Sequence, residues 1–154
     1  MNKSKQLISL MEEIEVSFED GRLEMSDSDG GKLTGQFTDI EDPREGYPLG
    51  LAAYGSDVAD EVEKKIEGIE CIFYLEDIRV SPDARGKKLG AKMMKRMESE
   101  AKKKGADAVI ANASPNGFGK ERVPFAVLKS FYTKMGYEFL YIYQNKNGLI
   151  MKRL

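Results

Sequence analysis

A strand, a basic turn and a helix follow one another over residues 71–104, and this segment constrains the fold more than any other. Residues 71–80 are rich in β-branched and aromatic side chains, as expected of a mostly buried strand. Pro82 ends the strand, because proline cannot donate a ladder hydrogen bond and restricts the residue before it. Apolar side chains then recur at spacings of three and four, which predicts a helix over residues 88–104.

The turn between this strand and helix has the sequence RGKKLGA and is suited to a polyanion. Gly86 and Gly90 let the backbone approach a ligand, and the N–H groups of a helix's first turn favour phosphate. Arg85 offers a planar fork of donors. Two further basic side chains either add charge at the ligand or only solvate the helix surface: Lys87 and Lys88.

The run from residue 80 to residue 91 resembles the acyl-CoA pyrophosphate loop of the GNAT superfamily of N-acetyltransferases. That loop reads Arg/Gln-x-x-Gly-x-Gly/Ala after a strand ending Val-x-Pro, and Arg85 and Gly90 match its outer positions. Lys88 stands in place of the inner glycine. The resemblance implies acetyl-CoA as the cofactor, bound in this turn by Arg85, Gly86, Lys87, Lys88, Gly90 and Ala91.

The resemblance also implies how the cofactor lies against the sheet. In that family the pantetheine arm pairs with the end of the preceding strand, here with backbone groups near Ile78 and Val80. Strand 107–113 then splays away and leaves a gap. Asn112 and Ser114, at the exit of that strand, either line the cofactor cleft or are ordinary turn residues.

A second motif, FYTKMGY over residues 131–137, resembles the Phe-Tyr-x-x-x-Gly-Phe that ends a core helix in GNAT enzymes. In that family the tyrosine donates a proton to the departing CoA thiolate, and Tyr132 holds the matching position. Tyr132 also belongs to an apolar helical stripe with Leu128 and Met135, so a plain core role is the alternative.

A carboxylate is the other group that such chemistry needs, because it can take the ammonium proton directly or through water. Glu76 lies inside an otherwise apolar strand, and GNAT enzymes often take their base from this strand. A satisfied carboxylate at the rim of the sheet is the alternative. Strict alternation puts Glu76 on one face with Ile78 and Val80, and Asp77 on the other; Asp77 and Glu70 are lesser candidates for the base.

The order of the elements predicts an α/β fold with a mixed central sheet flanked by helices. The resemblance implies that this sheet is mostly antiparallel and splayed between strands 70–80 and 107–113. We expect one N-acetyltransferase domain over residues 1–154, with the family motifs in 70–143 and an atypical region in 1–69. The expected helices are 4–14, 56–67 (capped by Ser56 or Asp57), 88–104 and 125–135. The expected strands are 16–19, 23–25, 33–40, 49–54, 70–80, 107–113, 137–143 and 149–154, with Asp20-Gly21 as a hairpin turn.

Composition excludes several kinds of site. The chain has no histidine, which rules out Ser-His-Asp and Cys-His catalysis and argues against a zinc site, so we expect no metal. Its single cysteine, Cys71, cannot form an internal disulfide and is expected in the core. No apolar run approaches the ~20 residues that span a bilayer, and no signal peptide is evident. We therefore expect no membrane partner and a cytoplasmic location.

Charge divides the chain into two halves. Residues 1–70 carry 18 acidic and 7 basic side chains, whereas residues 71–154 carry 8 acidic and 17 basic ones. A basic half suits an anionic cofactor, and an acidic half suits a cationic acceptor, either a small-molecule amine or an amine of a protein. The alternative is that the acidic half only solvates the surface. Dimers are common in the resembling family, so a homodimer stays open.

Two other functions are weighed against direct acetyl transfer to a primary amine. A GNAT-like domain could bind acyl-CoA, or a partner, without catalysis. The basic helix could instead bind nucleic acid, but it lacks interleaved aromatic residues and the pI is near 5.4, which disfavours this function.

Overall fold

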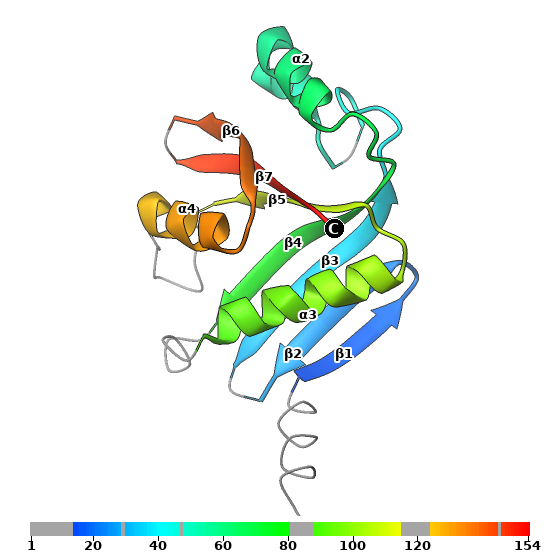
Figure 1. The fold of residues 1–154 in the computed structure, drawn as a ribbon, viewed down its shortest axis with the longest axis vertical. Helices are drawn as coiled ribbons and strands as arrows, with labels where there is room; N and C mark the ends of the chain where they lie inside the picture. Colours follow the sequence, from blue (N-terminus) through cyan, green and yellow to red (C-terminus); the bar gives the residue numbers. More distant parts are fainter. Residues whose placement is uncertain (1–13, 29, 47, 81–87, 115–123, 145) are drawn as a thin grey trace, which may run out of the picture.

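A seven-stranded sheet forms the centre of the computed structural model, which describes residues 14–154 except 29, 47, 81–87, 115–123 and 145 (Figure 1). The strand order is β1-β2-β3-β4-β5-β7-β6. All neighbours are antiparallel except β4 and β5, which run parallel, so the predicted mixed sheet is confirmed. The strands are β1 (Ile14–Glu19), β2 (Arg22–Asp27), β3 (Gly31–Asp39), β4 (Cys71–Val80), β5 (Ala108–Ala113), β6 (Glu138–Tyr143) and β7 (Asn147–Arg153).

Helices cover the sheet from both faces (Figure 1). They are η1 (Leu51–Tyr54), α2 (Ser56–Lys65), α3 (Leu89–Lys103) and α4 (Phe125–Lys134). Met93, Met94 and Met97 of α3 are fully buried in one core cluster, which also holds Tyr132 of α4, so the predicted apolar face of this helix is confirmed. A second cluster on the opposite face packs η1 and α2 against β4, β5, β6 and β7.

Along the chain, the helices η1 and α2 come after β3 and before β4, although these two strands are neighbours in the sheet. The preceding strands follow one another through short turns, and the predicted hairpin at Asp20 and Gly21 is confirmed, both residues having positive φ. Among the described residues, no helix covers the face of β1–β3 that lies opposite α3. That face therefore presents charged side chains to solvent, among them Glu15, Glu24 and Lys32.

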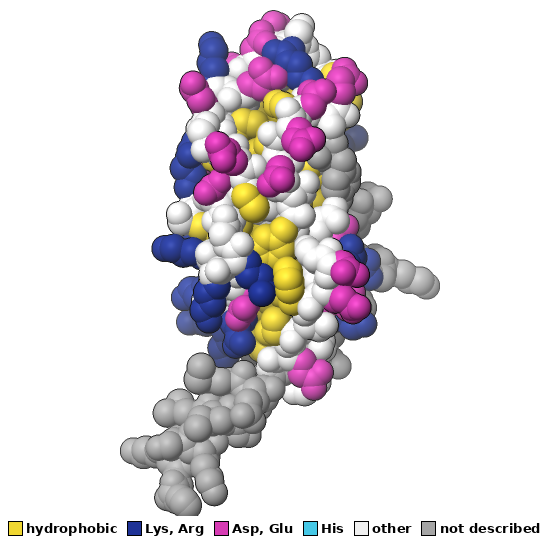
Figure 2. Space-filling model, turned by 90° about the vertical axis from the view of Figure 1, so that its right-hand side faces the viewer, with side chains coloured by type: hydrophobic (Ala, Val, Ile, Leu, Met, Phe, Trp, Pro, Cys, Tyr) yellow, Lys and Arg dark blue, Asp and Glu magenta, His cyan; other side chains and the backbone are white. Residues whose placement is uncertain are grey.

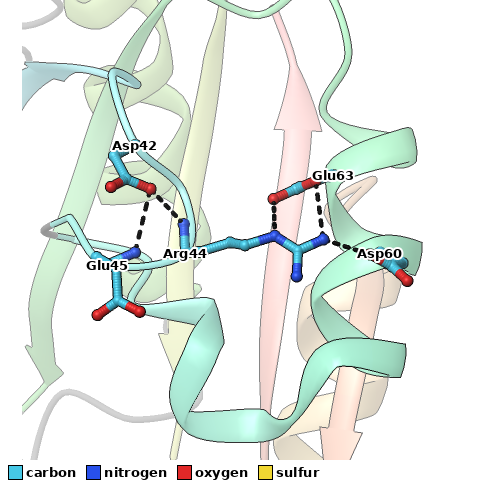
Figure 3. A network of polar contacts seen from close by, with 5 residues as sticks. All are labelled: Asp42, Arg44, Glu45, Asp60 and Glu63. Carbon is cyan, nitrogen blue, oxygen red and sulfur yellow. Dashed lines mark hydrogen bonds and ion pairs between the residues drawn. The ribbon is translucent and has the colours of Figure 1, made fainter.

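Arg44 links the loop before η1 to α2 (Figure 3). The Nε of Arg44 donates to Oε1 of Glu63 over 2.6 Å, and its Nη2 donates both to Glu63 and to Asp60. These hydrogen bonds raise the pKa of the Arg44 guanidinium. Asp42 accepts the backbone N–H groups of Arg44 and Glu45, so the loop before η1 is turned and attached to α2.

A β-bulge at Glu76 corrects the predicted faces of β4. Thr34 pairs with Asp77 and Gly35 pairs with Leu75, so Glu76 is left without a partner on β3. The extra residue shifts the alternation, and Ile78 packs in the same cluster as Leu75. Strict alternation beyond residue 75 was therefore wrong. Glu76 and Asp77 both lie on the face opposite α3, since Asp77 pairs with Thr34 and Glu76 bonds to a side chain of that face, Arg22.

Two local predictions for the part of the chain between β3 and β4 were also wrong. Residues 49–54 do not form a strand; Leu51–Tyr54 form a short 3₁₀ helix, flanked by Gly50 and Gly55 at positive φ. A short apolar run does not by itself distinguish a strand from a buried helical turn. Gly55 holds the N-cap position of α2 without a side-chain cap, so Ser56 and Asp57 lie within the helix. The predicted helix over residues 4–14 lies outside the described residues, apart from Ile14, which begins β1.

Candidate active site

The two parallel strands separate part of the way along the sheet. β4 pairs with β5 from Ile72 to Leu75 and no further, although both strands continue. A cavity of about 250 Å³ opens at this point. It is lined by Leu75, Glu76, Asp77, Ile78, Arg79, Ala111, Asn112, Ser114 and Tyr132. The predicted gap between these strands is therefore present, and Asn112 and Ser114 both face it.

Tyr132 reaches this cavity from the last turns of α4. Its side chain is buried and packs between two aromatic rings, with centroid distances of 5.2 Å to Phe131 and 5.9 Å to Tyr137. Burial, and then the negative charge of Asp77, raise the pKa of Tyr132 to about 12. The phenol consequently keeps its proton at neutral pH. Tyr132 is thus both a core residue and a cavity residue, and the two predicted alternatives do not exclude each other.

The bulge places two consecutive acidic residues, Glu76 and Asp77, on one face of the sheet, and both line the cavity. Oε1 of Glu76 lies 2.8 Å from Nη1 of Arg22, and Oδ2 of Asp77 lies 2.6 Å from Nε of Arg79. Asp77 was a lesser candidate for the base in the sequence, and strict alternation put it on the other face of the strand from Glu76. Arg22, on β2, was not predicted at all, and no local signal could have found it, since its contact with Glu76 spans 54 residues of the chain.

The helix α3, which follows β4 along the chain, begins with an unusual backbone conformation. Lys88, at the N-cap of α3, has φ 60 and ψ 22, the left-handed region that glycine enters most easily. No side chain of the described residues caps this end of the helix, and no acidic residue lies in its first turn. The N–H groups of Leu89, Gly90 and Ala91 have no acceptor within the helix by virtue of their position.

Gly90 has room for a side chain. A Cβ there would meet Phe131 at 3.6 Å and Val80 at 3.7 Å, which are ordinary contacts. Packing within the described protein therefore does not require glycine at this position. Of the other predicted cofactor residues, Ile78 lines the cavity and Val80 ends β4, whereas Arg85, Gly86 and Lys87 lie outside the described residues.

The surface repeats the charge division of the sequence. In Figure 2 acidic side chains predominate in the upper part of the molecule, and basic side chains gather at the lower left. The exposed acidic residues of α2 are Asp57, Asp60 and Glu61, and the exposed basic residues of α3 are Lys92, Lys95, Lys102 and Lys103.

The described residues also bear on two other kinds of site. They contain no group of three or more His, Cys, Asp and Glu side chains able to hold a metal ion. None of the helices in this part of the chain has the length and apolar character required to cross a membrane.

A family model described as an acetyltransferase (GNAT) domain matches residues 45–139 of the chain. No curated protein matches the sequence.

Solved structures resemble the fold at low sequence identity, so they bear on the fold alone. A mosquito arylalkylamine N-acetyltransferase like 5b shares 17% identity with a TM-score of 0.57, over 100% of this chain and 82% of that one. The Drosophila melanogaster polyamine N-acetyltransferase, which forms N-acetylagmatine, shares 12% with a TM-score of 0.54, over 87% and 75%. The PaiA N-acetyltransferase of Thermoplasma acidophilum, in complex with coenzyme A, shares 14% with a TM-score of 0.50, over 99% and 72%.

Proposed function

Since the chain belongs to the GNAT family of acetyltransferases, whose cofactor is acetyl-CoA, we propose that residues 1–154 form one N-acetyltransferase domain acting on a primary amine. One observation carries the proposal: Tyr132, Glu76 and Asp77 all line the cavity where β4 and β5 separate, and the negative charge of Asp77 acts on the Tyr132 phenol. A residue that can donate a proton and two that can accept one therefore line the same cavity.

The described residues fit the cofactor at two places. Among the described residues, β4 has no strand partner on its β5 side beyond Leu75, which supports backbone pairing of an extended chain near Ile78 and Val80. At the start of α3, Gly90 leaves room for a ligand beside the backbone, although the packing of the protein would accept a Cβ there. The N–H groups of the first turn favour a diphosphate. Residues 85–87 complete this proposed binding turn, with Arg85 as the phosphate ligand and Gly86 and Lys87 beside it.

When bound, the cofactor supplies an acetyl group activated as a thioester, for direct attack by the amine. The protein holds the amine and the acyl group together, which is the larger part of such catalysis. Tyr132 donates its phenolic proton to the departing sulfur. Its pKa, raised to about 12, means that the phenol is protonated at neutral pH before the reaction.

Glu76 is the proposed base, and it takes the proton of the ammonium group directly or through water. Its side chain is 27% exposed, so water can reach it. Asp77 faces the same cavity and is the second candidate. In either case the base starts as a carboxylate bonded to an arginine, which the incoming ammonium group must partly replace.

The proposed acceptor is a cationic amine, from a small molecule or a protein. The acidic side chains of the open face of β1–β3 and of α2 support a cation, and two similar structures belong to proteins named for arylalkylamine and polyamine acetylation. The cytoplasmic location and the homodimer stay predictions.

Release of free CoA thiol, measured against panels of amines and peptides, tests the function. We expect turnover with at least one cationic amine, and a fall in kcat of about 100-fold in Tyr132→Phe, the usual size for loss of a general acid. The KM for acetyl-CoA should barely change. Binding of acetyl-CoA without turnover on any amine would instead indicate a binding module, and full turnover by Tyr132→Phe would remove its acid role.

A further inference from the structure

A largely buried carboxylate, bonded to the neighbour of Tyr132 in the core, takes no part in the chemistry above. The side chain of Glu98, on α3, is 12% exposed. Its Oε2 accepts a hydrogen bond of 2.8 Å from the Tyr137 hydroxyl, and its Oε1 accepts one of 2.9 Å from Nζ of Lys152. A buried charge is costly unless it is paired and hydrogen-bonded. Because both oxygens have donors, the carboxylate is held in one position.

The same groups reach the end of α4. Nζ of Lys152, on β7, also donates to the carbonyl of Met135 over 3.0 Å. Met135 is the C-cap of α4, where a cation interacts favourably with the helix dipole. The backbone N–H of Tyr137 donates to the carbonyl of Tyr132 over 2.9 Å. The three side chains, named here the Glu98 network (Glu98, Tyr137 and Lys152), thus join α3, α4 and β7.

The network touches Tyr132 through a ring contact. The rings of Tyr132 and Tyr137 lie edge to face, 5.9 Å apart at an angle of 70°. Phe131 packs against Tyr132 as well, at 5.2 Å. Tyr137 is 4% exposed and cannot move while its hydroxyl is bonded to Glu98. The hydrogen bond between the Tyr137 hydroxyl and Glu98 of α3 therefore bears on the position of the Tyr132 ring.

We propose that Glu98, Tyr137 and Lys152 are positioning residues, which fix the Tyr132 hydroxyl in the cavity between β4 and β5. This role rests on the proposed function, in which Tyr132 is the acid. The network does not touch the cavity itself, since none of its three residues lines it. It acts by holding the end of α4 and the neighbouring ring.

Tyr137→Phe tests this role, because it keeps the ring and removes only the hydroxyl. We expect kcat to fall about 10-fold, since small displacements of a reacting group can cost up to ~100-fold, while the KM for acetyl-CoA stays within about twofold. In a Tyr132→Phe background the second change should have no further effect, because both act through one hydroxyl. Additive losses would overturn the proposal.

A matched control lies on the same helix. Glu100 is 16% exposed and pairs over 3.1 Å with Arg96, which lies one turn earlier on α3 itself. Glu98→Gln should lower kcat, whereas Glu100→Gln should lower only thermal stability. Lys152→Arg should retain more turnover than Lys152→Met, which provides a second route if Tyr137→Phe folds poorly. Equal effects of the Glu98 and Glu100 changes on kcat would show a purely structural network and overturn the proposal.

The two proposals fail in different ways. If Tyr132→Phe alone retains full turnover, the acid role fails and the positioning role fails with it. If Tyr132→Phe slows turnover and Tyr137→Phe does not, only the positioning role is overturned.

Discussion

Arg22 and Glu76 form an ion pair across β3, with 2.8 Å between Nη1 and Oε1. Arg22 lies on β2, and the intervening strand contributes Gln36 opposite it. Glu76 lies on the face of the sheet opposite α3, as Arg22 does, and the bulge leaves it without a partner on β3. Arg22 has an alternative partner in Glu24, whose Oε1 lies 3.7 Å from its Nε. A cationic acceptor can therefore compete with Arg22 for Glu76, and Arg22 can move to Glu24.

Removing the competing cation should strengthen binding of a cationic acceptor. In Arg22→Gln we expect the KM for the amine to fall by up to about fivefold, since charged pairs of this exposure are worth up to ~1 kcal/mol. The KM for acetyl-CoA should not change. Initial rates at varied amine concentration measure this effect, and it should weaken as salt is added.

Glu76→Gln provides the opposite change at the same pair. It removes the proposed base, so kcat should fall by about 100-fold or more near neutral pH, and part of the loss should be recovered at alkaline pH, where more of the amine is unprotonated. Asp77→Asn is the matched comparison, because Asp77 faces the same cavity. A larger loss in Asp77→Asn than in Glu76→Gln would transfer the role of base to Asp77.

Sequence patterns predicted most of the sheet, because alternation and turn chemistry are local signals. The hairpin at Asp20 and Gly21 is an example. The apolar face of α3 was predicted from helical spacing in the same local way. The bulge at Glu76 was not predictable in this way, since it depends on the register that β3 imposes through Gly35. A Cβ at Gly35 would lie 2.3 Å from Cζ of Phe73, so this glycine is needed where Phe73 crosses β3.

Lys88 holds a backbone conformation that suits glycine, and it stands at the glycine position of the family's loop. Lys88→Gly should therefore raise the free energy of unfolding by roughly 0.5–1 kcal/mol, because a left-handed residue with a side chain costs about 1–2 kcal/mol and glycine returns part of that gain as entropy. Chemical denaturation measures the change. Lys88→Ala is the control: it removes the charge but keeps the strain, so it should give no such gain.

Gly90 should separate stability from cofactor binding. Because a Cβ there makes only ordinary contacts, and alanine favours a helix by about 1 kcal/mol over glycine, Gly90→Ala should be at least as stable as the original chain. If the backbone lies against the cofactor, the KM for acetyl-CoA should nevertheless rise, by about 10-fold in Gly90→Val. An unchanged KM in both variants would contradict the assignment of the phosphate-binding turn.

The candidate site was predictable to the extent that it rests on two short motifs. Tyr132 and the gap beside Ile78 follow from the resemblance, and the structure places both at one cavity. Glu98 and Lys152 were not predictable, since they lie 54 residues apart and each reads as a surface charge on an amphipathic element. Their burial depends on how α3, α4 and β7 meet.

Asp107 should make stability depend on pH. Its Oδ2 accepts the backbone N–H groups of Glu70 and Cys71, at 3.1 and 3.0 Å, and these bonds lower the pKa of Asp107 below its usual value. A carboxyl whose pKa is lower in the folded state stabilises the fold above its unfolded pKa, near 3.9, and loses that contribution as the pH falls through the folded value. Asp107→Asn should therefore lower the melting temperature at pH 7, and the difference from the original chain should shrink as the pH falls below about 4. Thermal unfolding followed by circular dichroism at several pH values measures it, and a difference that grows towards acid would contradict this assignment.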